Sequence, residues 1–292
     1  MAAVLISNGM KKSNNMTLKQ LFLSAAMYVL PSTLIMILLS WLNVFTNATV
    51  ELGLNHYAEN SLSFFPKFVP MPFNTIINFG YVLVGIYWIL FISEGHKSGI
   101  VSCNDVFMFF MFNLMGVFYG FIQLYRILFQ TRASAVLDQW YTLPFFMFVF
   151  AWSRTFSSKL NKDINKLKYY ILLSTLSYSL TFLSIIGFEI TLGIHIVLAV
   201  GGAILLQKQY PSEEATKYFI FGILSCSGFV VLKLLDHILP SFHWIFSYVS
   251  GHFISKICDV LQLHFVNEFF FDMVLSKAVG MSQDTQTHFK QS

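Results

Sequence analysis

Long, uninterrupted runs of apolar residues dominate the chain, and short polar segments separate them. The runs lie near 20–45, 74–93, 105–129, 136–153, 169–187, 189–206, 218–236 and 251–275. Each is close to the ~20 residues that a helix needs to cross a hydrocarbon core of ~30 Å. A membrane β-strand would instead alternate apolar and polar residues. The pattern therefore predicts an all-α, polytopic membrane protein with about eight transmembrane helices.

Polar segments flank a single membrane domain, predicted over residues 20–276. Residues 1–19 contain three lysines and no acidic residue, and we predict a cytosolic N-terminal tail there. The run at 20–45 is longer than the roughly 7–15-residue core of a signal peptide. We interpret it as a retained N-terminal anchor that precedes a seven-helix bundle. Residues 277–292 are polar and predicted to form a disordered cytosolic tail, whereas the aromatic segment 237–251 is expected in the membrane interface.

The distribution of Lys and Arg predicts the orientation. With the N-terminus in the cytosol, 13 of the 18 basic residues fall on the cytosolic side, and only Lys67 and Arg132 fall on the opposite side. Such an excess marks cytoplasmic loops, so we expect both termini in the cytosol. We expect a secretory-pathway endomembrane (Golgi or vesicles) rather than the plasma membrane. Asn47, in the sequon Asn47-Ala48-Thr49, is then a lumenal glycosylation candidate.

Composition narrows the possible partners. Only 11% of the residues are charged, against roughly 25% in soluble domains. The net charge of +4 is spread over several loops, which argues against a nucleic-acid partner. The three cysteines show no C-x-x-C spacing, so neither a disulfide framework nor a cysteine metal site is expected. Membrane lipids are the expected partners, and the sequence indicates no protein partner.

Polar and ionisable side chains inside the spans gather in the predicted lumenal half. Such residues are costly in hydrocarbon and mark either function or a paired structural network. We expect them to line one polar cavity among the helix ends. The expected lining is Asn74, Gln123, Arg126, Glu189, Lys233 and Lys256, and the candidate catalytic residues are Asp138, Asp236, His237, His252, Ser255 and Asp259.

The last span carries the most informative spacing. His252, Lys256 and Asp259 follow the i, i+4, i+7 rule and therefore share one helix face. Because an unpaired charge in hydrocarbon is costly, this face should turn inward and pair Lys256 with an acid. We expect Asp138, His252, and Asp236 or His237 to approach one another at the lumenal end. The alternative is that these residues form separate pairs that only fix helix packing.

Several long motifs closely resemble the transmembrane protein 187 family. They are NHYAENSL with MPFNTIINFGYVLVGIYW, YGFIQLYRILFQTRASAVLDQWYTLP, GFEITLGIHIV, and LSCSGFVVLKLLDH followed by GHFISKICDVLQLHF. The match runs from about residue 53 to 270 with its spacing intact. The resemblance implies a multi-pass membrane protein of uncharacterised biochemistry.

A more distant likeness connects the chain with seven-helix hydrolases of the alkaline ceramidase and progestin/adipoQ receptor type. That resemblance implies a zinc ion held by three histidines, two of them at H-x-x-x-H on the last helix. His252 fits the first of these two positions and Asp138 fits the family's aspartate, but Lys256 stands where the second histidine belongs. The span at 105–129 contains no histidine. No cofactor is therefore expected; zinc is disfavoured, and His252 is the one weak candidate ligand.

Three functional hypotheses remain open. The leading one is a non-catalytic or degenerate hydrolase-like bundle that binds a lipid or amphipathic ligand in the lumenal polar cavity. The second is a lipid amidase or another hydrolase with a rearranged site, in which Ser255 or water would be the nucleophile. The third is a proton-coupled transporter, in which Lys256 and Asp259 would relay protons, or a trafficking scaffold.

Overall fold

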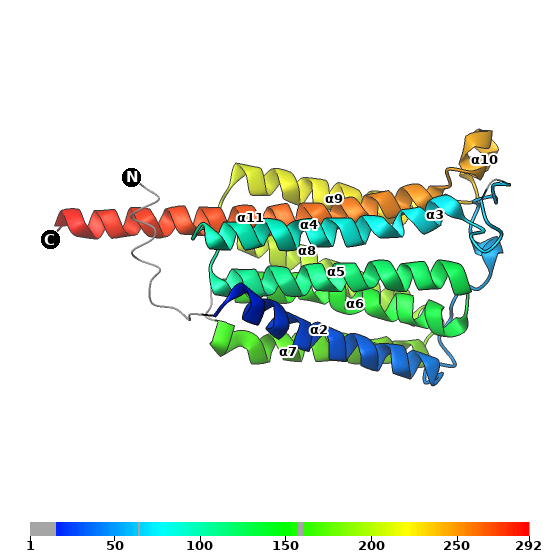
Figure 1. Cartoon of the computed structure of the whole chain (residues 1–292), viewed down its shortest axis with the longest axis horizontal. Helices are drawn as coiled ribbons and strands as arrows, with labels where there is room; N and C mark the ends of the chain where they lie inside the picture. Colours follow the sequence, from blue (N-terminus) through cyan, green and yellow to red (C-terminus); the bar gives the residue numbers. More distant parts are fainter. Residues whose placement is uncertain (1–15, 64, 157–159, 292) are drawn as a thin grey trace.

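The apolar runs fold as long helices that lie side by side in one bundle (Figure 1). The structure is a computed structural model that describes residues 16–63, 65–156 and 160–291. Within this part of the chain there are helices and no strand, so the all-α prediction is confirmed. The long helices are α2 (Leu18–Trp41), α4 (Asn78–Lys97), α5 (Cys103–Phe129), α6 (Arg132–Thr155), α7 (Leu160–Ser177), α8 (Gly187–Gln209), α9 (Glu213–Leu234) and α11 (Gly251–Gln291).

The remaining elements are short helical turns at one end of the bundle. They are η1 (Leu54–His56), α3 (Pro72–Ile76), η2 (Tyr178–Phe182), α10 (Leu239–Phe242) and η3 (Trp244–Ser247). We call this end, with the segments 42–71 and 235–250, the loop end; the other end, where α2 and α5 begin, is the N-terminal end (Figure 1). The aromatic segment predicted for the interface forms α10 and η3, where Phe242 and Trp244 are exposed.

Five of the described helices are long and apolar enough to cross a membrane. They are α2, α3 with α4, α5, α8 and α9. Helices α6, α7 and α11 lie in the same bundle but carry more polar residues. The membrane class is thus established, whereas the count of about eight spans stays a prediction.

The predicted helix bounds differ most from the observed ones in two places. The span expected at 169–187 begins at Leu160 and leaves α-helical geometry after Ser177, where η2 follows. Gly187 permits the tight return into α8, since a Cβ there would lie 2.3 Å from the Leu180 carbonyl oxygen. Helix α11 continues to Gln291, where the sequence predicts a disordered tail. The segment after Lys277 contains no proline and many residues that accept helical geometry, so the helix can extend.

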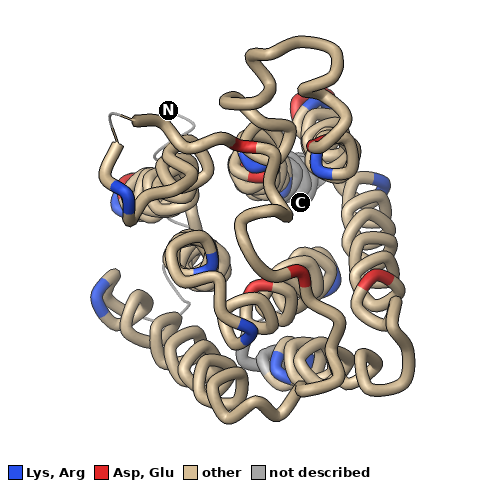
Figure 2. Tube along the Cα trace, turned by 90° about the vertical axis from the view of Figure 1, so that its right-hand side faces the viewer, with Lys and Arg blue, Asp and Glu red and all other residues tan. Residues whose placement is uncertain are grey.

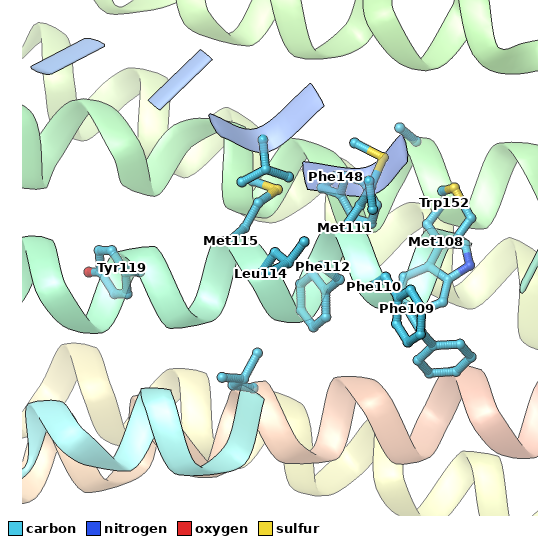
Figure 3. Packing of buried hydrophobic residues seen from close by; sticks show 14 of the residues in the cluster. Met108, Phe109, Phe110, Met111, Phe112, Leu114, Met115, Tyr119, Phe148 and Trp152 are labelled. Atoms are coloured by element: carbon cyan, nitrogen blue, oxygen red, sulfur yellow. The ribbon is translucent and has the colours of Figure 1, made fainter. Parts of the chain in front are cut away.

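Helix α5 forms the centre of the bundle, with α2, α4 and α6 packed around it. Bulky side chains of α5 meet α6 in the interior, as Figure 3 shows. The Phe109 ring lies edge-on to Trp152, with centroids 4.7 Å apart, and Trp152 stacks at 3.8 Å on Phe270 of α11. Viewed along the bundle, the charged residues are few and dispersed (Figure 2).

Candidate functional site

The first member of the site is Glu59, a loop residue that caps a helix. Its carboxylate accepts from the backbone N–H groups of Phe73 (2.7 Å) and Asn74 (2.9 Å), at the start of α3. It also accepts from the Asn74 side-chain amide at 2.6 Å. Burial raises the pKa of Glu59 above its ordinary value, although these N–H donors and the charge of Lys256 act in the opposite direction. The loop is thereby fixed to the beginning of the α3–α4 segment.

The second member is a cationic contact between α4 and α11. The ammonium group of Lys256 donates to the amide oxygen of Asn78 at 3.0 Å, and Asn78 in turn donates to the Asn74 carbonyl at 2.9 Å. Lys256 is 3% exposed and Asn78 is 1% exposed. The Lys256 charge therefore lies inside the bundle.

One turn further along the same two helices, Tyr81 and Asp259 form the third contact. The Tyr81 hydroxyl donates to Asp259 at 2.6 Å. The Tyr81 ring lies edge-on to Tyr119 of α5, whose hydroxyl is 3.4 Å from that of Thr142 in α6. Gly120 allows this close approach, because a Cβ at Gly120 would lie 2.8 Å from the Asn78 carbonyl oxygen. Small residues let membrane helices approach in this way.

A fourth group joins α5, α6 and the loop. The Gln123 amide donates to the Asp138 carboxylate, and Arg126 donates to the backbone carbonyl of Glu51. The pKa of the nearby Tyr57 hydroxyl is raised to about 12. Burial is the main cause; the charge of Arg126 acts in the opposite direction, and that of Asp138 adds to the increase. Gln123 and Arg126 are both buried, so these polar groups are held inside the fold.

Asp236 organises the start of α11. Its carboxylate accepts from the backbone N–H of His252 at 2.7 Å and from that of Ala58 at 3.0 Å. The His252 ring lies edge-on to Tyr57, with centroids 4.5 Å apart. Asp236 and His252 are therefore together, and Tyr57 neighbours both this pair and the group that contains Asp138.

The hydrogen-bond partner of Lys256 is not the acid that the sequence predicts. Lys256 bonds to the amide of Asn78 rather than to an acid, and Asp259 bonds to the Tyr81 hydroxyl. Asp236 accepts from backbone N–H groups, and Lys233, expected to line the polar cavity, is exposed. Neutral donors and acceptors suffice here because they satisfy the buried charges through hydrogen bonds.

The remaining predicted residues lie in various environments. Glu189 is exposed in the first turn of α8, and Asn47 is exposed at the loop end. His237 is exposed and contacts the His56 carbonyl at 3.1 Å. The buried Ser255 hydroxyl donates to the His252 carbonyl at 2.7 Å, a common bond for serine inside a helix. In the described part of the chain, no three His, Cys, Asp or Glu side chains are grouped so that they could hold a metal ion.

A narrow crevice reaches the polar groups from the side of the bundle. Two adjoining cavities of about 70 and about 30 Å³ share Phe146, Val149, Gln262 and Val266. The outer cavity is walled by α8 and α9, including Gly222, and the inner one reaches Tyr119, Thr142 and Asp259. We call the pair the lateral crevice. It is almost entirely apolar except at its inner end.

Gln262 is the unusual residue of this crevice. It lines both cavities, and its buried side-chain oxygen has no hydrogen-bond partner. A buried acceptor of this kind normally has a partner. Sequence reasoning singled out Asp259 but missed Glu59, Tyr81 and Tyr119. Glu59 lies in a loop, and tyrosines in an apolar run resemble ordinary packing residues, so the sequence carried no signal for them.

Comparisons with known proteins agree on one family. The model of the TMEM187 protein family matches residues 25–271. Transmembrane protein 187 of Homo sapiens is 39% identical over 224 residues, which cover 76% of this chain and 82% of that protein. Transmembrane protein 187 of Bos taurus is also 39% identical over 224 residues, with 86% of its length covered. No solved structure matches this chain significantly.

Proposed function

The chain belongs to the TMEM187 protein family, and we propose that this multi-pass membrane protein binds a single-chain amphipathic molecule in the lateral crevice. Because the two cavities together are only about 100 Å³, they would hold the polar head and the first carbons of the ligand, with the head at Asp259 and Gln262 and the rest of the hydrocarbon lying along α8 and α9 in contact with lipid. The observation that carries the proposal is the buried Gln262 oxygen without a partner, at the inner end of an otherwise apolar crevice.

The residues that line the crevice favour a small head group that can donate a hydrogen bond and carries no negative charge. Asp259 supplies a carboxylate, Tyr119 and Thr142 supply hydroxyls, and neither cavity is lined by a Lys or Arg. Such a site suits a hydroxyl, amide or amine head, because each can donate to the carboxylate or to the free Gln262 oxygen. A carboxylate or phosphate head would lie beside Asp259 and be repelled.

Access from the membrane fits the position of the crevice. Its outer wall includes half-buried residues of α8 and α9, such as Val200, Gly222 and Ile223. Apolar side chains of the same helices are exposed, among them Val197 and Leu224. In a membrane these surfaces face lipid tails, so a ligand could enter sideways. The loop end would face the lumen, as the distribution of basic residues predicts.

Binding of matched probes tests the proposal. We expect purified protein in detergent to bind oleyl alcohol and oleylamine more tightly than oleate, as measured by native mass spectrometry. Gly222→Trp should abolish this binding, because an indole there would fill the outer cavity. Gly193→Trp is the matched control, since Gly193 lies on α8, is exposed and does not line the crevice. Equal binding by both variants would refute the proposed site.

A further inference from the structure

A second intramembrane cavity lies on another side of the bundle, between α2 and α7. Its volume is about 280 Å³, and its walls come from α2, α5, α6 and α7. Most of the lining is apolar and includes Val29, Met36, Met111, Met115 and Leu172. We call it the α2–α7 groove. Its volume approaches the ~300 Å³ at which ligand pockets begin.

One end of the groove carries a positive charge. Lys168 lines the groove there, is exposed, and places its ammonium 5.2 Å from the centre of the Tyr28 ring. It stands eight residues after the start of α7, which corresponds to about 12 Å along a helix. A lysine side chain at this depth can extend to the head-group level while its stem stays in apolar surroundings. The charged end is thus the one nearer the N-terminal end of the bundle.

Two of the helices that wall the groove contain a proline. Pro31 lies inside α2, and Pro144, a lining residue, lies inside α6. Each lacks a backbone N–H and therefore removes one hydrogen bond of its helix. At the back of the groove, the Thr33 hydroxyl donates to the Tyr141 hydroxyl at 3.3 Å and so ties α2 to α6. The helices are therefore joined behind the groove, and the space in front of this tie remains open.

We propose that the α2–α7 groove binds an anionic phospholipid of the adjacent leaflet, with one acyl chain in the groove and the phosphate beside Lys168. Three features support this assignment: an elongated apolar cavity, a lysine at only one end, and a depth at which that lysine reaches the head groups. This site is separate from the lateral crevice, in which no cation lines the walls. The proposal therefore does not depend on the one made above.

Native mass spectrometry with two lipids of identical acyl chains tests the charge requirement. A membrane-facing Lys contributes roughly 1 kcal/mol to the free energy of binding an anionic lipid. We therefore expect dioleoyl phosphatidylglycerol to bind about fivefold more tightly than dioleoyl phosphatidylcholine. Lys168→Gln should remove this preference. Lys208→Gln is the matched control, because Lys208 is exposed at the same end of the bundle in α8. The proposal would be overturned if both variants lost the preference for phosphatidylglycerol equally, or if Lys168→Gln kept it.

A second pair of variants tests the groove itself. Ile35→Trp should fill the groove and reduce binding of both lipids at least tenfold, whereas the neighbouring Leu34→Trp should not, since Leu34 is exposed but does not line it. Thermal unfolding confirms that both variants are folded. Soluble glycerophosphate should not displace the lipid. If it does, or if Ile35→Trp binds like Leu34→Trp, the acyl-chain site is wrong.

Discussion

The ammonium nitrogen of Lys256 lies 3.0 Å from the side-chain oxygen of Asn78 and joins α11 to α4 inside the bundle. This bond is charge-assisted, and both residues are buried. It stands between the capped start of α3, where Glu59 holds Asn74, and the contact of Tyr81 with Asp259. Two successive polar contacts, Lys256 with Asn78 and Asp259 with Tyr81, thus cross the α4–α11 interface toward the inner end of the lateral crevice.

Removing only the acceptor of this bond should lower the free energy of unfolding more than removing both the acceptor and the donor. Asn78→Leu leaves a buried ammonium without its partner, and we expect a loss of about 3 kcal/mol in the free energy of unfolding. The double variant Asn78→Leu with Lys256→Met removes the charge too and should recover more than half of that loss. Reversible unfolding in mixed detergent micelles measures both. A double variant less stable than Asn78→Leu alone would contradict a role of this bond in neutralising the buried charge.

Close packing at Gly120 should be sensitive to a single methyl group. A Cβ there would lie 2.8 Å from the Asn78 carbonyl oxygen and 3.1 Å from the Tyr81 Cβ, so Gly120→Ala must push α5 away from α4. We expect a destabilisation of about 1–3 kcal/mol. Gly193→Ala, which has no atom within 4 Å of its Cβ, should be neutral or stabilising by up to about 1 kcal/mol. Similar thermal shifts for the two variants would show that the contact at Gly120 is not tight.

The helices could be predicted from the sequence because apolar runs of span length have few alternative folds in a membrane. The inward position of Lys256 likewise followed from helical spacing and the cost of a lipid-facing charge. Its partner did not follow, since the sequence fixes the face of one helix but not the register between two. Asp259, one turn away on the same helix, was an available acid, but Tyr81 of α4 donates to it while Asn78 of α4 accepts from Lys256.

The loop contacts were beyond sequence reasoning for a different reason. Glu59 belongs to a polar loop in which an acidic residue is ordinarily solvated, and nothing in the local pattern marks it as the cap of α3. Asp236 was singled out, but as a candidate catalytic residue rather than as the acceptor of backbone N–H groups. Both carboxylates bond to backbone, and such bonds depend on the path of the loop rather than on side-chain identity.

Glu59 should make stability depend on pH in a defined direction. Its pKa is raised above the ordinary value of 4.5 by burial, so the folded protein holds a proton that the unfolded chain releases. Acidification from pH 7.5 through the folded pKa toward 4.5 should therefore stabilise the wild type relative to Glu59→Gln, which cannot titrate. Thermal unfolding of both proteins across this range measures the difference. A wild type that loses stability relative to the variant on acidification would show that the hydrogen bonds outweigh burial.

The predicted orientation can be tested with a new glycosylation site at the loop end. Leu62→Thr completes an N-x-[ST] sequon that begins at Asn60, an exposed residue of the loop. If the loop end is lumenal, this variant gains a glycan, seen as a slower gel band that an endoglycosidase reverses. Asn15-Met16-Thr17, a sequon in the N-terminal segment that begins outside the described residues, should stay unmodified. A glycan at Asn15 with none at Asn60 would invert the orientation.

Site-resolved photo-crosslinking tests the central claim, an amphipath in the lateral crevice, most directly. A diazirine-bearing oleyl alcohol is reconstituted with the protein in bilayers, irradiated, and the labelled residues are mapped by mass spectrometry. We expect labels to concentrate on crevice residues such as Phe146, Cys226 and Phe265, and to disappear from them in Gly222→Trp but not in Gly193→Trp. Labels spread evenly over the exposed apolar faces, unchanged by Gly222→Trp, would contradict the claim.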